Sequence, residues 1–164
     1  MDKVIPSSVV AAIKSETNAL DILDAGIYMC GHPQINDSVN IYLAVTENDL
    51  VLFQEPLFSG KSFDPRLPKQ KLEMKRLGEI PKKAIKQISI EDKTTIQNRI
   101  TATRLLTVGI FAFAWKKKEV NEMGFVVIEW TDSKNMENKT TFRLEGKGSL
   151  ATANTLRNTL VNCL

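Results

Sequence analysis

His32 is the only histidine of the chain, and it stands two residues after Cys30. A Cys-Gly-His run could begin a metal site or a cysteine–histidine pair, but structural zinc takes four ligands and this run supplies two. The sequence contains no Gly-rich phosphate loop, His-Glu-x-x-His motif or nucleophile elbow. We therefore expect Cys30 to end a strand and His32 to sit in a turn before Pro33. We predict no enzyme, no cofactor and no metal.

Three consecutive lysines follow the most apolar run of the sequence, residues 105–115. Eleven residues are too few for a transmembrane helix, which needs about 20. Lysines beside an anionic membrane gain about 1 kcal/mol each, and a neighbouring Trp favours the interface. The alternative is that residues 105–115 fill the core and the lysines solvate the loop after them. The candidate residues for contact with a membrane or a partner are Arg104, Phe113, Trp115, Lys116, Lys117 and Lys118.

Length and composition predict one main domain with its own core. The chain has 164 residues, of which 43% are hydrophobic, which is enough to fold without disulfides or metals. Its two cysteines form no framework, and its first residues lack the pattern of a signal peptide. We expect a cytoplasmic protein, either free or peripheral at the inner face of the membrane.

Charge is unevenly divided along the sequence. Residues 1–60 carry two Lys against eight acidic residues, a net charge of −6, whereas residues 61–164 carry twenty Lys and Arg against eleven, a net of +9. Such a split can produce an electropositive face that attracts anionic lipid, nucleic acid or an acidic partner. Alternatively, the two halves mix in space and their charges cancel.

Hydrophobic periodicity predicts antiparallel strands between two helices. The first helix spans 7–23 and the last follows Gly148-Ser149. Proline-rich residues 55–70 form a loop. The expected strands cover 27–30, 39–45, 50–54, 71–77, 88–90, 96–104, 125–130 and 140–144. The predicted fold class is mostly β (α+β), a bent antiparallel sheet or split barrel, with a helical appendage at 1–24 and the main domain at 25–164.

Three stretches over roughly residues 70–164 carry a resemblance to a known superfold. They are Ile80-Pro81 with Ile85, Ile88 and Ile90; Thr103-Arg104-Leu105-Leu106 through Gly109, Phe111 and Ala112 to Lys116-Lys117-Lys118; and residues 125–130 with 140–144 before the last helix. The middle stretch is the most specific. Together they resemble the bacterial relatives of the pleckstrin-homology (PH) and GRAM superfold. The resemblance implies a seven-stranded PH-like barrel with a C-terminal helix. It does not imply phosphoinositide binding, because residues 39–54 contain no Lys or Arg.

Two functions remain open at this point, since a superfold does not fix a function. The first is a binding or scaffolding module that contacts a protein partner or a second copy of itself. Its contact surface would be the first helix, an exposed sheet edge or the apolar residues 110–115. The second is peripheral binding to an anionic membrane, which should weaken as ionic strength rises. Nucleic acid is not predicted, because only Trp115 adjoins a basic run.

Overall fold

The computed structural model describes residues 4–56, 72–93, 95, 96, 98 and 123–164. Within these residues the sheet and its helices follow the predicted order, so the mostly-β, α+β class is confirmed. The elements are α1 (Ser7–Glu16), β1 (Asp21–Cys30), β2 (Asn40–Val45), β3 (Asp49–Gln54), β4 (Lys75–Pro81), the 3₁₀ helix η1 (Lys82–Ala84), β5 (Ile85–Glu91), β6 (Met123–Thr131), β7 (Glu137–Glu145) and α4 (Ser149–Asn162).

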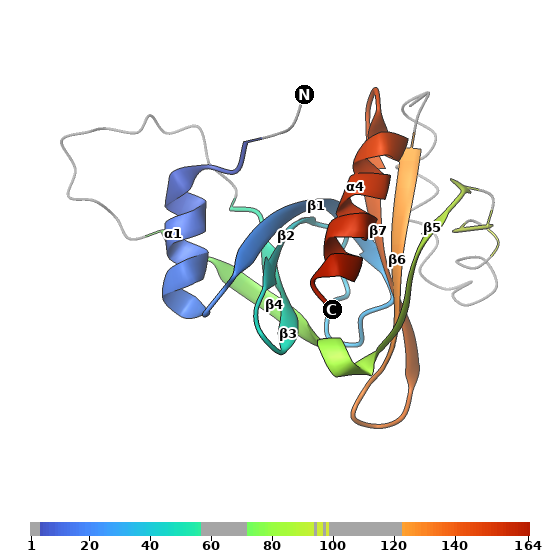
Figure 1. Cartoon of the computed structure of the whole chain (residues 1–164), viewed down its shortest axis with the longest axis horizontal. Helices are drawn as coiled ribbons and strands as arrows, with labels where there is room; N and C mark the ends of the chain where they lie inside the picture. The colour runs from blue at the N-terminus through green and yellow to red at the C-terminus, as the bar shows by residue number, and fades with distance from the viewer. Residues whose placement is uncertain (1–3, 57–71, 94, 97, 99–122) are drawn as a thin grey trace.

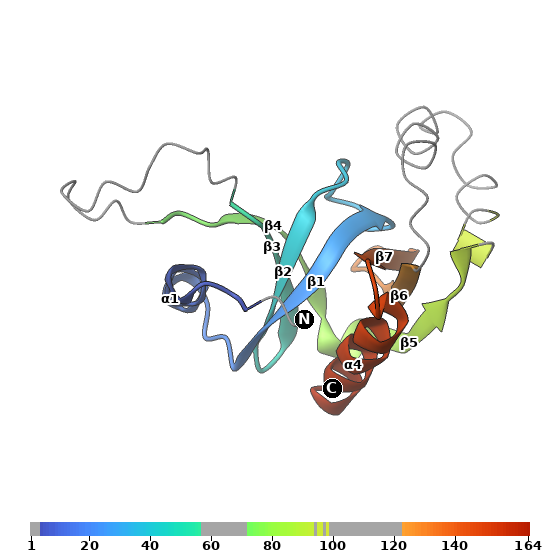
Figure 2. The same cartoon turned by 90° about the horizontal axis from the view of Figure 1, so that it is seen from above.

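The seven strands form one antiparallel sheet in the order β4-β3-β2-β1-β7-β6-β5. β4 and β5 follow each other in the chain but lie at opposite edges of the sheet. Only the three residues of η1 join them, so the sheet has to bend until its edges approach at this end (Figure 1). Figure 2 shows the two parts of the bent sheet, β1–β4 and β5–β7, on either side of the bend.

The inner face of the sheet holds the main core, and α4 covers it. The apolar residues of α4 recur at i, i+3 and i+7, so they form one stripe that faces the sheet. These are Ala153, Leu156 and Leu160, each 5% exposed or less, and they pack with Leu43, Leu52, Val126, Ile128 and Phe142. Burying one such leucine stabilises the fold by roughly 1.5–3 kcal/mol, which fixes α4 on β5, β6 and β7.

The outer face of β2 and β3 carries a second core beneath α1. Val9 and Ile13 of α1 are fully buried, and they pack in the same cluster as Tyr42 and Phe53. Both faces of β2 and β3 are therefore covered. This explains why β3 reads as a continuous apolar run, Leu50–Phe53, rather than as an alternating pattern.

Two local predictions are wrong. The first helix ends at Glu16 rather than near residue 23, because the backbone of Thr17 is extended. Residues 21–24 belong to β1, so the boundary placed at residue 24 falls inside that strand. The strand predicted over 96–104 fails at its start, since the Ile96 N–H donates to the Asp92 carbonyl in a helical i→i−4 bond. The rest of 96–104, apart from Asn98, lies outside the described residues.

Candidate binding groove

The predicted contact residues fall outside the part of the chain that the structure describes. They are Arg104, Phe113, Trp115, Lys116, Lys117 and Lys118. Their role in binding a membrane or a partner stays a prediction. Among the described residues, no helix combines the length and the apolar character needed to cross a bilayer.

His32 is held inside the fold and uses both ring nitrogens. Its Nδ1 accepts the backbone N–H of Gln34 at 3.2 Å, so in the neutral ring the proton resides on Nε2, which donates to the Glu79 carbonyl at 3.1 Å. The ring lies against Trp130, with 5.3 Å between centroids. His32 is only 2% exposed, and burial lowers its pKa below the ordinary value. The structural role expected for this turn residue therefore fits its contacts.

This histidine has no lone pair left for a metal ion. The Tyr28 hydroxyl also holds the loop that follows β1. It accepts a hydrogen bond from the backbone N–H of His32 at 2.9 Å and donates one to the Ile35 carbonyl at 3.1 Å. In the described residues no group of three or more His, Cys, Asp or Glu side chains is placed to hold a metal.

A groove opens where β1 and β7 part. β7 pairs with β1 only over Ile27–Cys30, whereas β2 pairs with β1 from Asp21 to Ile27. Beyond Glu145 the chain leaves the sheet through Gly146 and Gly148, both with positive φ (98° and 79°), and enters α4. The first half of β1 therefore has a groove beside it on this side, lined across from β1 by residues of α4. Figures 1 and 2 show where β1 and α4 lie in the fold. We call residues Asp21–Gly26, on this side, the β1 edge.

The groove has a volume of about 560 Å³, within the range of about 300–1,000 Å³ for ligand pockets. Its floor is apolar and continuous with the main core through Leu23, Leu144 and Leu156. The α4 wall presents the hydroxyl-bearing residues Thr152, Thr155 and Thr159. An elongated ligand with an apolar side and a polar side matches this lining.

The β1 edge is occupied by carboxylates from its own strand. The Ile22 N–H donates to Oδ1 of Asp21 at 2.8 Å, and the Gly26 N–H donates to Oδ1 of Asp24 at 2.9 Å. A side chain that satisfies its neighbour's N–H takes the place of an adjacent strand. Of the charged residues on the groove, Arg143 forms an ion pair with Glu145 at 2.7 Å, and Lys147 lies near the start of α4.

Sequence reasoning missed both walls of this groove. The apolar spacing predicts residues 21–23 as part of the first helix, and this prediction conceals the β1 edge. The sequence does hold a signal for the other wall, because Thr152, Thr155 and Thr159 recur at i, i+3 and i+7 beside the apolar stripe of α4. A row of threonines next to the buried stripe of a helix indicates that this side of the helix is only partly covered by the rest of the fold.

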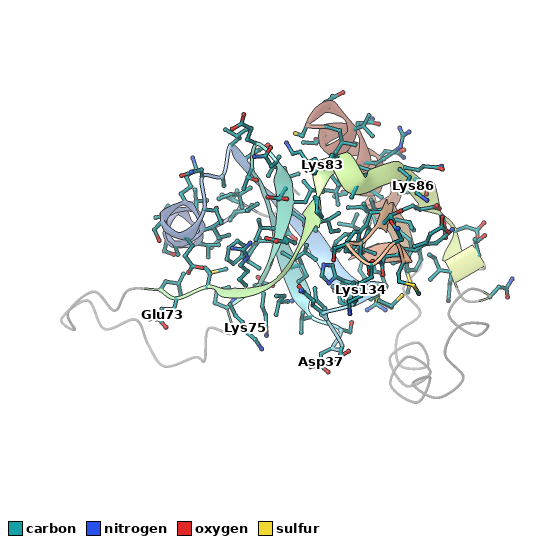
Figure 3. All side chains as sticks on the ribbon, turned by 90° about the horizontal axis from the view of Figure 1, so that it is seen from below. Asp37, Glu73, Lys75, Lys83, Lys86 and Lys134 are labelled. Carbon is teal, nitrogen blue, oxygen red and sulfur yellow. The ribbon has the colours of Figure 1, made fainter. Side chains whose placement is uncertain are left out.

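The described surface mixes charges from the two halves of the sequence. Figure 3 shows Asp37, from the acidic half, on the same face as Lys75, Lys83, Lys86 and Lys134, from the basic half. Glu73, beside Lys75 in the chain, lies there too.

Comparison with protein-family models and with curated proteins finds no match for this chain. Its function is therefore inferred from the fold and the groove.

Proposed function

We propose that this chain is a non-catalytic, PH-like interaction module that holds a segment of a protein partner in the groove between β1 and α4. The groove carries the proposal. Its floor is apolar and joins the main core, its α4 wall bears hydroxyl groups, and its other wall is backbone from a strand that β7 has left. Such a lining binds through apolar contact and backbone hydrogen bonds.

The strand order supports a PH-like architecture. Two antiparallel meanders, β1–β4 and β5–β7, meet at the β1–β7 pair, and the C-terminal helix covers the inner face of the bend. The sequence resemblance implies seven strands and a C-terminal helix, and this strand order supports the proposal. The fold alone does not select a ligand, so the groove is the feature on which this proposal rests.

A selection experiment tests the proposal. The full chain is immobilised and panned against a phage library of random dodecapeptides, and the enriched peptides are synthesised and titrated in solution. We expect enriched peptides with dissociation constants in the micromolar range, which is common for weak segment recognition. Sedimentation velocity across a hundredfold concentration range tests the other form of this function, self-association. A chain that enriches no peptide and stays monomeric would contradict the proposed function.

Membrane binding is the second candidate. It is supported by the sequence, in which Trp115 is followed directly by Lys116–Lys118. Vesicle co-flotation with neutral and anionic lipids tests it at low and physiological salt. Binding confined to anionic vesicles, and lost when Lys116, Lys117 and Lys118 are all changed to Glu, would favour this candidate. Absence of binding in every condition would remove it.

A further inference from the structure

We infer that the β1 edge takes up the partner segment as an added β-strand, which continues the sheet where β7 turns away. This inference rests on the proposed function and names the conformation and chemistry of the partner. The occupant is an extended peptide segment of another protein, with apolar side chains at alternate positions and a basic side chain beside Asp21 and Asp24.

The backbone of the β1 edge carries the first step. In a sheet, backbone groups of alternate residues face opposite neighbours. Ile22 lies opposite Ala44 of β2, and the Ala44 backbone groups face β3, because the Thr46 N–H two residues further on donates to the Asp49 carbonyl. The Ile22 N–H therefore faces away from β2, on the groove side, where it donates to the carboxylate of Asp21. A carbonyl of an incoming strand can accept this N–H in place of the Asp21 carboxylate. Asp21 is exposed, so its carboxylate can then turn to solvent or to a basic group of the partner.

The groove lining carries the second step. In an added strand, every second side chain points the same way. Those that point inward would meet Leu23, Leu144 and Leu156, the residues that join the groove to the core. The outward side chains would pass the hydroxyl-lined wall of α4. This pattern requires alternating apolar and polar residues in the partner.

The size and shape of the groove restrict the occupant to one strand. The β1 edge has six residues and therefore spans about 20 Å at roughly 3.3 Å per residue. α4 forms the opposite wall along this length through Ser149, Thr152, Thr155 and Thr159. A second folded copy would have to bring its own sheet edge in beside α4 to reach β1, so we take a single extended segment as the occupant.

Charge favours a basic segment. Asp21 and Asp24 both bind backbone N–H groups along the β1 edge, and an added strand brings its side chains close to them. The facing residues Thr152, Thr155 and Thr159 of α4 contribute no charge. Elsewhere on the lining Arg143 is paired with Glu145, and Lys147 lies near the start of α4, so the basic preference applies to the partner residue beside Asp21 and Asp24. All six neighbouring strand pairs of the sheet are antiparallel, so we expect an antiparallel segment along the line of β7.

The test uses the dodecapeptides enriched on the full chain. Nuclear Overhauser contacts are measured between the backbone of the bound peptide and the Ile22 amide. The affinity of two variants of the chain for the same peptide is measured as well. Thr155→Trp places a large side chain on the groove wall, and we expect at least a tenfold loss of affinity. Asn154→Trp is the matched control on the same helix; Asn154 is exposed and does not line the groove, and we expect a change of less than twofold.

A backbone variant separates strand addition from simple filling of the groove. Ile22→Pro removes the N–H that the added strand would use, at a site where that N–H makes no bond to β2. We expect at least a tenfold loss of affinity with this variant too. Circular dichroism shows whether Ile22→Pro folds. If it does not fold, strand addition is still tested by the Overhauser contacts and by comparing Thr155→Trp with Asn154→Trp.

Peptides that bind the chain but contact β5, or that bind Thr155→Trp as well as the original protein, would overturn the inference and leave the proposed function standing. A chain that enriches no peptide would overturn this inference; the proposed function falls with it only if the chain also stays monomeric in the sedimentation experiment. Enriched peptides that contact Ile22 but lack basic residues would overturn the charge preference alone.

Discussion

His32 Nε2 donates a hydrogen bond of 3.1 Å to the Glu79 carbonyl oxygen, which ties the loop after β1 to the edge strand β4. The same ring lies against Trp130 of β6. β4 belongs to the part of the bent sheet formed by β1–β4 and β6 to the part formed by β5–β7, so His32 connects the two parts. A buried neutral imidazole thus holds the fold where no strand pair does so.

Stability should fall as the pH drops below about 6.5, the ordinary pKa of histidine. Burial lowers the pKa of His32 in the folded chain, so between the folded pKa and 6.5 the unfolded chain binds the proton more readily. The His32 contribution is complete above pH 6.5 and is lost as the pH falls towards the folded pKa. Urea unfolding at pH 7.5 and 5.5 measures this difference.

The control for this prediction is His32→Gln, which should remove the pH dependence between 7.5 and 5.5 at some cost in stability. Asp132 and Glu137 do not interfere, because hydrogen bonds lower their pKa values below the ordinary 3.8 and 4.5. An equal pH dependence in His32→Gln and in the original chain would contradict the assignment to His32.

Much of the sheet was predictable because its signals are local. The hairpin of β2 and β3 and that of β6 and β7 follow from apolar runs around polar turns, and α4 follows from its apolar stripe. The helix prediction includes residues 21–23 because its apolar spacing runs from Val9 to Leu20 and the next turn signal is Gly26. Pairing with β2 decides between helix and strand, and pairing is a tertiary property that a local pattern does not contain.

The groove was harder to predict for the same reason. Two residues of its walls, Ile22 and Thr155, lie 133 positions apart in the sequence, and they face the same groove only because β7 parts from β1. Gly146 and Gly148 mark that departure, but a glycine pair before a helix also occurs where no groove forms. Conversely, Trp115 and its lysines gave the clearest sequence signal and lie outside the described residues.

Gly31→Ala should destabilise the fold strongly. Gly31 has a φ of 93°, and an added Cβ would collide with the Lys139 carbonyl of the neighbouring strand. Backbone strain of about 1–3 kcal/mol and overpacking of about 1–3 kcal/mol both apply, so we expect a loss of roughly 3 kcal/mol or more in the free energy of unfolding. Urea unfolding at pH 7.5 measures it.

Gly146→Ala is the matched control, because Gly146 has a similar φ of 98° but nothing within 4 Å of an added Cβ. Only the strain applies there, so we expect a loss of about 1–2 kcal/mol. Equal losses in the two variants would show that the close approach of Gly31 to β7 contributes nothing.

Thr140→Val should cost about 1–3 kcal/mol, the penalty for leaving a buried donor unsatisfied. The indole Nε1–H of Trp130 donates to Oγ1 of Thr140 at 2.9 Å, and both residues are 4% exposed or less. Valine keeps the shape of threonine and removes the acceptor. Thr155→Val is the control, since Thr155 is exposed and its change should stay within about 0.5 kcal/mol. Similar urea midpoints for both variants would be inconsistent with this hydrogen bond.

Ile13→Ala should lower the free energy of unfolding by about 2–5 kcal/mol, as expected when a large side chain is deleted from a core. Ile13 is fully buried and packs with Tyr42 and Phe53 on the outer face of the sheet. The control Leu20→Ala removes a side chain that is 71% exposed, so we expect a change within about 0.5 kcal/mol.

Hydrogen exchange then shows whether α1 is part of the fold or an appendage to it. If α1 belongs to the cooperative unit, Ile13→Ala reduces the protection of β2 and β3 together with that of α1, because these strands lose the cover of their outer face. Faster exchange in α1 alone, with an unchanged urea midpoint, would instead make α1 a separate attachment. We expect the first result, because the cluster that contains Ile13 also contains Tyr42, Val51 and Phe53 of the sheet itself.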